Sequence, residues 1–242
     1  IAFNGYVEKP LKIKFVQKGI TQLSNKIDNI EIIAKNGETS AEADTMYQRA
    51  INPIDYENRN SLPIGIIVAG QSNTDGRVPY EQLPSGVLDE NKKIKNCIYN
   101  GSVFTKESGN WGYDVIFYSN LSKYLGDTNF YVAKYAAGGT AISQLASSTC
   151  WQPKIELLSS YNNSCILKLV KQINDVIQIN PDIQFRAMLW HQGETDGTNA
   201  EAAKDYYQNF KNVIAYVRGT VKNPALPIIY GTIGKNSSQY NA

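Results

Sequence analysis

The stretch Ile64-Gly65-Ile66-Ile67-Val68-Ala69-Gly70-Gln71-Ser72-Asn73 decides the fold class of this chain. It opens with a continuous apolar run, which is typical of a parallel strand that is covered on both faces. Further strands are predicted at residues 94–99, 130–136, 184–190 and 226–232. Amphipathic helix patterns at 166–177 and 206–217 separate the last three of these. Alternating strands and helices predict an α/β fold, a three-layer α/β/α sandwich with a parallel, flavodoxin-like sheet.

The first sixty residues follow a different pattern. An a/d heptad repeat, with spacings of 4, 3, 4, 3 and 4, is formed by Val16, Ile20, Leu23, Ile27, Ile30 and Ala34. Isoleucine at both positions favours trimers or larger bundles over dimers, whereas an amphipathic helix packed on its own domain is the alternative. We therefore predict a helical, coiled-coil segment and linker over 1–60, a homotrimer through 16–34, and a separate α/β domain over 61–242.

Composition excludes several classes of protein. The 24 Lys and Arg against 22 Asp and Glu give a formal net charge of +2, which argues against nucleic acid as a partner. We find no apolar run of about 18 residues, so no membrane span is expected. Cys97, Cys150 and Cys165, with a single histidine, fit no zinc pattern, and we expect no metal and no cofactor. The thiols are predicted to be reduced, and a Cys150–Cys165 disulfide is the alternative in an exported protein.

Three of the predicted strands end in polar or glycine-rich clusters, and ligands bind at the carboxyl ends of strands in such sheets. Ser72 follows the first strand in a turn that exposes its hydroxyl and lets its own N–H face an oxyanion. A helix-capping serine is the alternative. Gly138 and Gly139 follow the third strand, where glycines offer unobstructed N–H donors or form a plain turn.

The fourth strand ends in His191-Gln192-Gly193-Glu194, where polar groups are costly unless they are paired or used. The Gln192 amide is able to donate to an oxyanion, and the Glu194 carboxylate is able to orient an imidazole. His191 is otherwise a structural histidine. Because side chains alternate along a strand, we expect His191 to point away from Gln192.

Taken together, the blocks around Ser72, Gly138 and His191 resemble those of SGNH-type carbohydrate esterases, in the group of acetylxylan esterases and sialate O-acetylesterases. Trp151 with Pro153 resembles that group too. The resemblance implies an esterase that removes O-acetyl groups from acetylxylan-type or sialic acid-type carbohydrates through an acetyl-enzyme intermediate, without a metal.

By this resemblance Ser72 is the nucleophile. Its N–H, an N–H of Gly138 or Gly139 and the Gln192 side chain form the oxyanion hole. Glu194 is the acid member of the triad.

The chain departs from the family pattern in its general base. The family places this histidine in a D-x-x-H motif after the fifth strand, whereas His191 is the single histidine here. We expect that the domain lacks its C-terminal helix and that histidine, because the fifth strand would otherwise expose an apolar face. The alternatives are that His191 is the base, that a neighbouring subunit supplies one, or that the module is inactive and binds sugar.

A second hypothesis belongs to another class of function. The heptads and the esterase-like domain also suit an oligomeric glycan-binding or adhesion module, for example in a phage tail or fibre. Both hypotheses predict an O-acetylated carbohydrate as the partner. Both also predict an extracellular, secreted or virion-associated protein.

Overall fold

The computed structural model describes residues 12–15, 30–33, 63–153 and 163–234. The chain divides into two compact units, Ile1–Ser61 and Leu62–Ala242. In the first unit, β1 (Lys12–Phe15) pairs in antiparallel fashion with β2 (Ile30–Ile33). Apart from β2, the predicted heptad helix and trimer segment over 16–34 lies outside the described residues.

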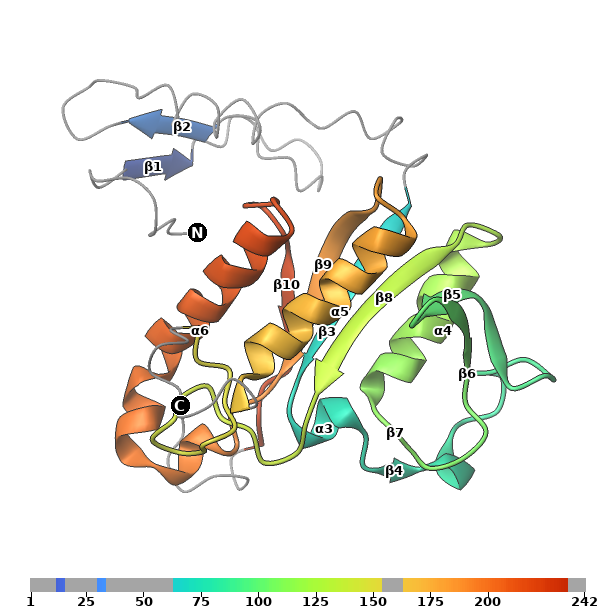
Figure 1. The fold of residues 1–242 in the computed structure, drawn as a ribbon, viewed down its shortest axis with the longest axis horizontal. Helices are drawn as coiled ribbons and strands as arrows, with labels where there is room; N and C mark the ends of the chain where they lie inside the picture. Colours follow the sequence, from blue (N-terminus) through green and yellow to red (C-terminus); the bar gives the residue numbers. More distant parts are fainter. Residues whose placement is uncertain (1–11, 16–29, 34–62, 154–162, 235–242) are drawn as a thin grey trace, which may run out of the picture. The chain divides into compact units, whose positions relative to one another are not determined.

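The second unit is built on a six-stranded sheet (Figure 1). Its strands are β3 (Ile64–Gly70), β5 (Lys93–Tyr99), β6 (Ser102–Thr105), β8 (Phe130–Ala136), β9 (Gln184–His191) and β10 (Ile228–Tyr230). All five predicted strands are confirmed, although the last one is shorter than predicted. β6 runs antiparallel to β5, whereas the other strand pairs are parallel. The sheet is therefore mostly, not wholly, parallel.

The predicted flavodoxin-like strand order is wrong. The spatial order is β10-β9-β3-β8-β5-β6, so the five parallel strands, numbered along the chain, lie in the order 2-3-1-4-5. Flavodoxin-like sheets have the order 2-1-3-4-5. The apolar strand β3 is paired with β8 and β9 over its whole length, whereas β5 exposes Lys93 and Lys95. A strand with alternating lysines suits a place near the edge of the sheet, where charge is tolerated.

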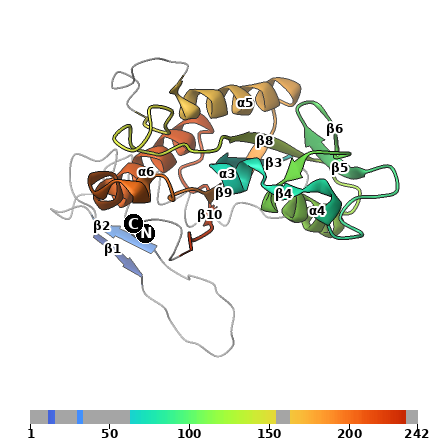
Figure 2. The same ribbon diagram turned by 90° about the horizontal axis from the view of Figure 1, so that it is seen from below.

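Helices cover both faces of the sheet. Figure 2 shows α5 (Cys165–Ile179) and α6 (Ala200–Thr220) on one face and α4 (Tyr113–Leu125) on the other. Successive residues of β3 point into opposite cores, so that Ile67 packs under α5 and Val68 packs with α4. These two cores confirm that the apolar run is covered on both faces.

The described part of this unit also contains short elements between the strands. They are α3 (Ser72–Asp75), β4 (Val78–Pro79), η1 (Tyr80–Gln82), β7 (Asn110–Trp111) and η4 (Asp196–Thr198). Capping side chains fix the starts of the two long helices. Ser164 accepts from the Leu167 N–H at the start of α5, and Asn199 accepts from the first N–H groups of α6.

All three cysteines are buried and unbridged. The prediction of reduced thiols is confirmed, and the alternative Cys150–Cys165 disulfide is not formed. Burial raises the pKa of the Cys165 thiol to about 12, so this group is a neutral part of the core at ordinary pH. Among the described residues, no helix combines the length and the apolar character that crossing a bilayer requires.

Candidate active site

The turn after β3 is fixed against β9 by close backbone contacts. Gly70 has a φ of +153°, and a Cβ there would run into the His191 carbonyl oxygen and Thr74 Oγ1. The next residue, Gln71, donates its N–H to the same carbonyl at 3.0 Å. Ser72 therefore begins α3 directly beyond the end of the central strand (Figure 1). Gln71 is the residue at the N-cap, so Ser72 is not the capping serine that was the alternative.

Ser72 lies beside a glycine turn whose N–H groups are unused among the described residues. A Cβ built on Gly138 would lie 3.8 Å from the Ser72 Cβ, so the two backbones lie close together. Within the described ranges, the Ser72 hydroxyl forms no hydrogen bond, and the N–H groups of Ser72, Gly138 and Gly139 have no partner. Both glycines are exposed. Free, solvent-accessible N–H groups beside a hydroxyl are what an oxyanion hole requires.

Gln192 occupies a different position from the one predicted. Its Nε2 donates to Asp196 Oδ2 at 2.7 Å, to Gln71 Oε1 at 3.1 Å and to the Thr140 carbonyl at 3.1 Å. These three acceptors use both amide hydrogens, and the side chain is buried. In this arrangement Gln192 holds neighbouring turns together and has no hydrogen left for an oxyanion.

Asp196, which sequence reasoning missed, is the centre of this cluster. It accepts the N–H groups of Ile142 at 2.8 Å and Ser143 at 2.9 Å in addition to the Gln192 amide. Burial raises the pKa of Asp196, although the hydrogen bonds that it accepts oppose that effect. We call the set Gln71, Thr140, Gln192 and Asp196 the Asp196 network. It joins the turns that follow β3, β8 and β9.

Glu194 is joined to the nucleophile turn. Asn73 Nδ2 donates to Glu194 Oε1 at 2.8 Å. The other oxygen, Oε2, is buried and has no hydrogen-bond partner in the described part of the chain. A buried carboxylate oxygen without a donor is costly, and an imidazole N–H is the donor that the acid of a serine triad holds.

The His191 imidazole forms no hydrogen bond with Ser72. The ring packs edge-on against Tyr113, with 6.0 Å between ring centres, and its Cδ2 lies against Gly231. Its Nδ1 is buried and makes no hydrogen bond among the described residues. The backbone carbonyl of His191, not its ring, supports the turn that contains Ser72.

Arg77 is a second residue that sequence reasoning missed. Its Nη1 donates to Asp75 Oδ2 at 3.0 Å and to the Gly76 carbonyl at 2.8 Å. A Cβ on Gly138 would collide with Arg77 Nη2, so the guanidinium lies against the glycine that faces Ser72. A cation therefore borders the predicted oxyanion hole. In the sequence, the signal for this role was the position of Arg77, five residues after Ser72. No group of three or more His, Cys, Asp or Glu able to hold a metal ion occurs in the described part.

A comparison with family models gives one match, over residues 65–242, to the carbohydrate esterases described as sialic acid-specific acetylesterases. The chain belongs to this family. The matched range includes Ser72, both glycines of the predicted oxyanion hole, and Glu194. A search of curated protein sequences gives no significant match.

Two solved structures share the fold of this esterase family member. A protein from Arabidopsis thaliana aligns at TM-score 0.57 and 20% identity, covering 74% of this chain and 77% of its own. NanS aligns at TM-score 0.52 and 15% identity, covering 72% of this chain and 69% of its own. At these identities the likeness establishes a common fold, and the chemistry of the site must be argued from its residues.

Proposed function

We propose that the chain is a serine esterase that removes O-acetyl groups from carbohydrates of the acetylxylan or sialic acid type. The observation that supports this most directly is that Ser72, whose hydroxyl forms no hydrogen bond among the described residues, lies beside Gly138, whose N–H is unused. Membership of a carbohydrate esterase family supplies the class of reaction.

The proposed reaction has two steps. Ser72 Oγ bonds to the acetyl carbonyl carbon while a base takes its proton, and the N–H donors hold the oxyanion. The carbon–oxygen bond to the sugar then breaks, and the sugar hydroxyl leaves with that proton. Water repeats the sequence on the acetyl-enzyme and releases acetate and free Ser72.

The base is an imidazole held by Glu194. Glu194 lies one hydrogen bond away from Asn73, the neighbour of Ser72, and keeps a buried oxygen free to accept an N–H. We propose that an imidazole other than that of His191 fills this place, because the His191 ring packs on Tyr113.

Acetate release from O-acetylated xylan and from O-acetylated sialic acid tests the proposal. Free imidazole is added as the base. We expect release that rises with imidazole and falls by at least about a thousandfold in Ser72→Ala. Unchanged release by Ser72→Ala, after the reaction of imidazole alone is subtracted, would refute the proposal.

A glycan-binding module of low or no activity is the second candidate. The absence of an imidazole on Ser72 among the described residues favours it. It predicts that the protein binds acetylated glycans without releasing acetate, even when imidazole is present. The same assay, run with a binding measurement on the same sample, separates the two candidates.

A further inference from the structure

A cavity of about 370 Å³ lies beside the nucleophile helix at the carboxyl edge of the sheet. It is bounded by Asp75 of α3, by Tyr99 at the end of β5 and by Ala136 at the end of β8. Asp75 is three residues from Ser72, and Ala136 is two residues from Gly138. A molecule in this cavity would therefore lie next to the predicted site of acyl transfer. We call it the Lys106 cavity.

One wall of this cavity contains an ion pair that is almost fully enclosed. Lys134 Nζ donates to Asp114 Oδ2 at 2.7 Å, and the two side chains are 14% and 2% exposed. The other oxygen, Asp114 Oδ1, is buried and forms no hydrogen bond within the described ranges, although the Tyr118 hydroxyl is close to the carboxylate. Burying such a pair costs desolvation energy, and an incompletely bonded pair is a poor source of stability. Lys134 keeps some exposure, and its remaining ammonium hydrogens suit a ligand with hydroxyl groups.

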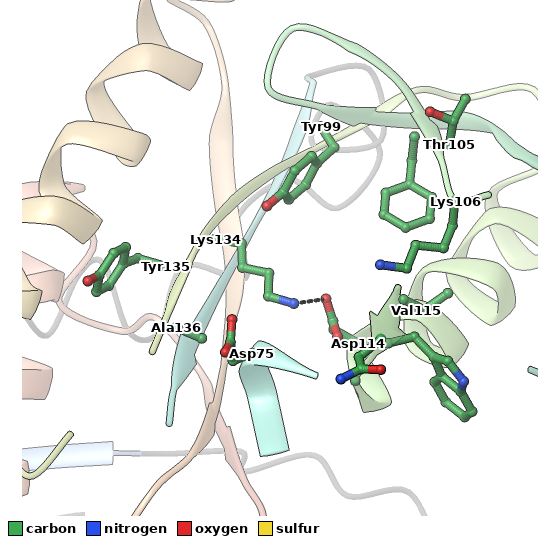
Figure 3. A pocket seen from close by; sticks show the side chains of 13 residues that line it. Asp75, Tyr99, Thr105, Lys106, Asp114, Val115, Lys134, Tyr135 and Ala136 are labelled. Atoms are coloured by element: carbon green, nitrogen blue, oxygen red, sulfur yellow. Dashed lines mark hydrogen bonds and ion pairs between the residues drawn. The ribbon is translucent and has the colours of Figure 1, made fainter. Parts of the chain in front are cut away.

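The second lysine of the cavity is without a counter-ion. Lys106 follows β6, and its backbone N–H donates to the Lys92 carbonyl at 3.0 Å, which fixes the start of its side chain. Its ammonium forms no ion pair or hydrogen bond with any described residue. Figure 3 shows Lys106 directed into the same space as the Lys134–Asp114 pair.

Summing the charges around the cavity leaves one positive charge. Asp75 is neutralised by Arg77 at 3.0 Å, and Asp114 is neutralised by Lys134. Only the Lys106 ammonium then lacks a partner among the charged residues that line the cavity. Apolar and aromatic side chains complete the walls, namely Tyr99, Phe104, Trp111 and Val115. Aromatic walls with a few convergent polar groups are the usual make-up of a small-molecule site.

We propose that the Lys106 cavity binds the ring of an acidic sugar, a uronic or nonulosonic acid. The Lys106 ammonium pairs with the sugar carboxylate, and Lys134 Nζ hydrogen-bonds to a ring hydroxyl. This inference rests on the proposed function, because it presents an acetyl group on the bound ring to Ser72. It selects acidic sugars over neutral xylan as the substrate class.

Calorimetric titration of the 242-residue chain with unacetylated sugars tests the inference. The probes are the methyl glycosides of N-acetylneuraminic acid and glucuronic acid, with xylobiose as the neutral comparison. We expect at least one acidic sugar to bind and xylobiose to bind at least about tenfold more weakly. Lys106→Gln should weaken binding of the acidic sugar by about tenfold or more, and Lys106→Arg should restore part of it. Lys204→Gln, which removes an exposed lysine on α6, is the matched control and should change nothing.

The outcomes separate this inference from the proposed function. Equal binding of xylobiose, no binding of either acidic sugar, or full binding by Lys106→Gln would each overturn the inference. Ser72→Ala should bind the acidic sugar as well as the unmodified chain does. A failure of esterase activity with intact, Lys106-dependent binding would therefore refute the function and leave the cavity assignment standing.

Discussion

Two polar clusters flank Ser72, and they differ in how completely their hydrogen bonds are used. In the Asp196 network, Gln192 Nε2 meets three acceptors and the Asp196 carboxylate accepts three donors. In the Lys106 cavity, the Lys106 ammonium and Asp114 Oδ1 have no hydrogen-bond partner among the described residues. The Gln192 amide hydrogens and the Asp196 carboxylate are fully bonded, although Gln192 Oε1 is buried without a partner among the described residues. A cluster saturated in this way fixes a structure, whereas an unpaired ammonium beside a cavity has capacity left for a ligand.

This contrast assigns different tasks to residues that look alike in the sequence. Gln192 and Asp196 position the turns after β3, β8 and β9, and substrate need not touch them. Lys106, which forms no ion pair or hydrogen bond with a described residue, contributes little to holding the fold and is available to a sugar. Changes in the first cluster should therefore appear as lost stability, and changes in the second as lost binding.

The largest effect is expected from a substitution that breaks the Asp196 network. Asp196→Ala leaves the N–H groups of Ile142 and Ser143 and the Gln192 amide without their acceptor. We expect the free energy of unfolding, measured with denaturant, to fall by about 3 kcal/mol. Acetyl transfer to Ser72 should be lost with it. Asp205→Ala, an exposed position on α6, and Lys106→Gln should each stay within about 0.5 kcal/mol of the unmodified chain. A similar loss of unfolding free energy in Lys106→Gln would show that the Asp196 network and the Lys106 cavity do not differ in what they contribute to stability.

A smaller effect is expected at Glu194, where one carboxylate oxygen accepts a hydrogen bond and the other has no partner among the described residues. Glu194→Gln keeps an oxygen for the Asn73 amide but removes the charge that supports an imidazolium. We expect imidazole-dependent acetate release to fall by at least about tenfold. Stability should be unchanged or slightly higher, because a carboxylate oxygen without a partner is removed. Glu81→Gln, exposed in η1, is the control. Equal activity in the two variants would exclude Glu194 from the reaction.

The smallest effect is expected at Cys150 and Cys165, whose thiols should be unreactive in the unmodified chain. Cys165 donates its backbone N–H to the Cys150 carbonyl, and both side chains are buried. Because the pKa of Cys165 is raised to about 12, its reactive thiolate is scarce at pH 8, and labelling should become faster as the pH rises. Iodoacetamide at pH 8, followed by mass spectrometry, should label neither residue in the native chain. Labelling should become detectable in Asp196→Ala, and rapid labelling of the unmodified chain would show that this region opens freely.

The sequence predicted the local elements better than their arrangement. β3 and β8 are found within one residue of their predicted bounds, because a buried parallel strand needs a continuous apolar run. α4 was missed, since its buried positions include Asp114 and Ser119 and its apolar period is interrupted. The strand order was mistaken because pairing between distant strands leaves no local pattern.

The candidate site was predicted only in part, because contacts between distant segments leave no local pattern in the sequence. Ser72 and the two glycines could be found from strand-end position and residue type. The roles of Gln192 and Asp196 depend on contacts between turns more than fifty residues apart, which no single segment encodes. Lys134 did give a signal, because a lysine inside the otherwise apolar strand β8 requires a buried partner.

The central claim is that Ser72 accepts an acetyl group, and the mass of the protein tests it most directly. The 242-residue chain is mixed with an acetyl ester and imidazole, quenched in acid within the first turnover, and digested for mass spectrometry. The proposed function predicts one added acetyl group on the peptide that contains Ser72, and none in Ser72→Ala. Acetate released at the full rate without acetylation of Ser72, or an acetyl group that persists on that peptide in Ser72→Ala, would contradict it.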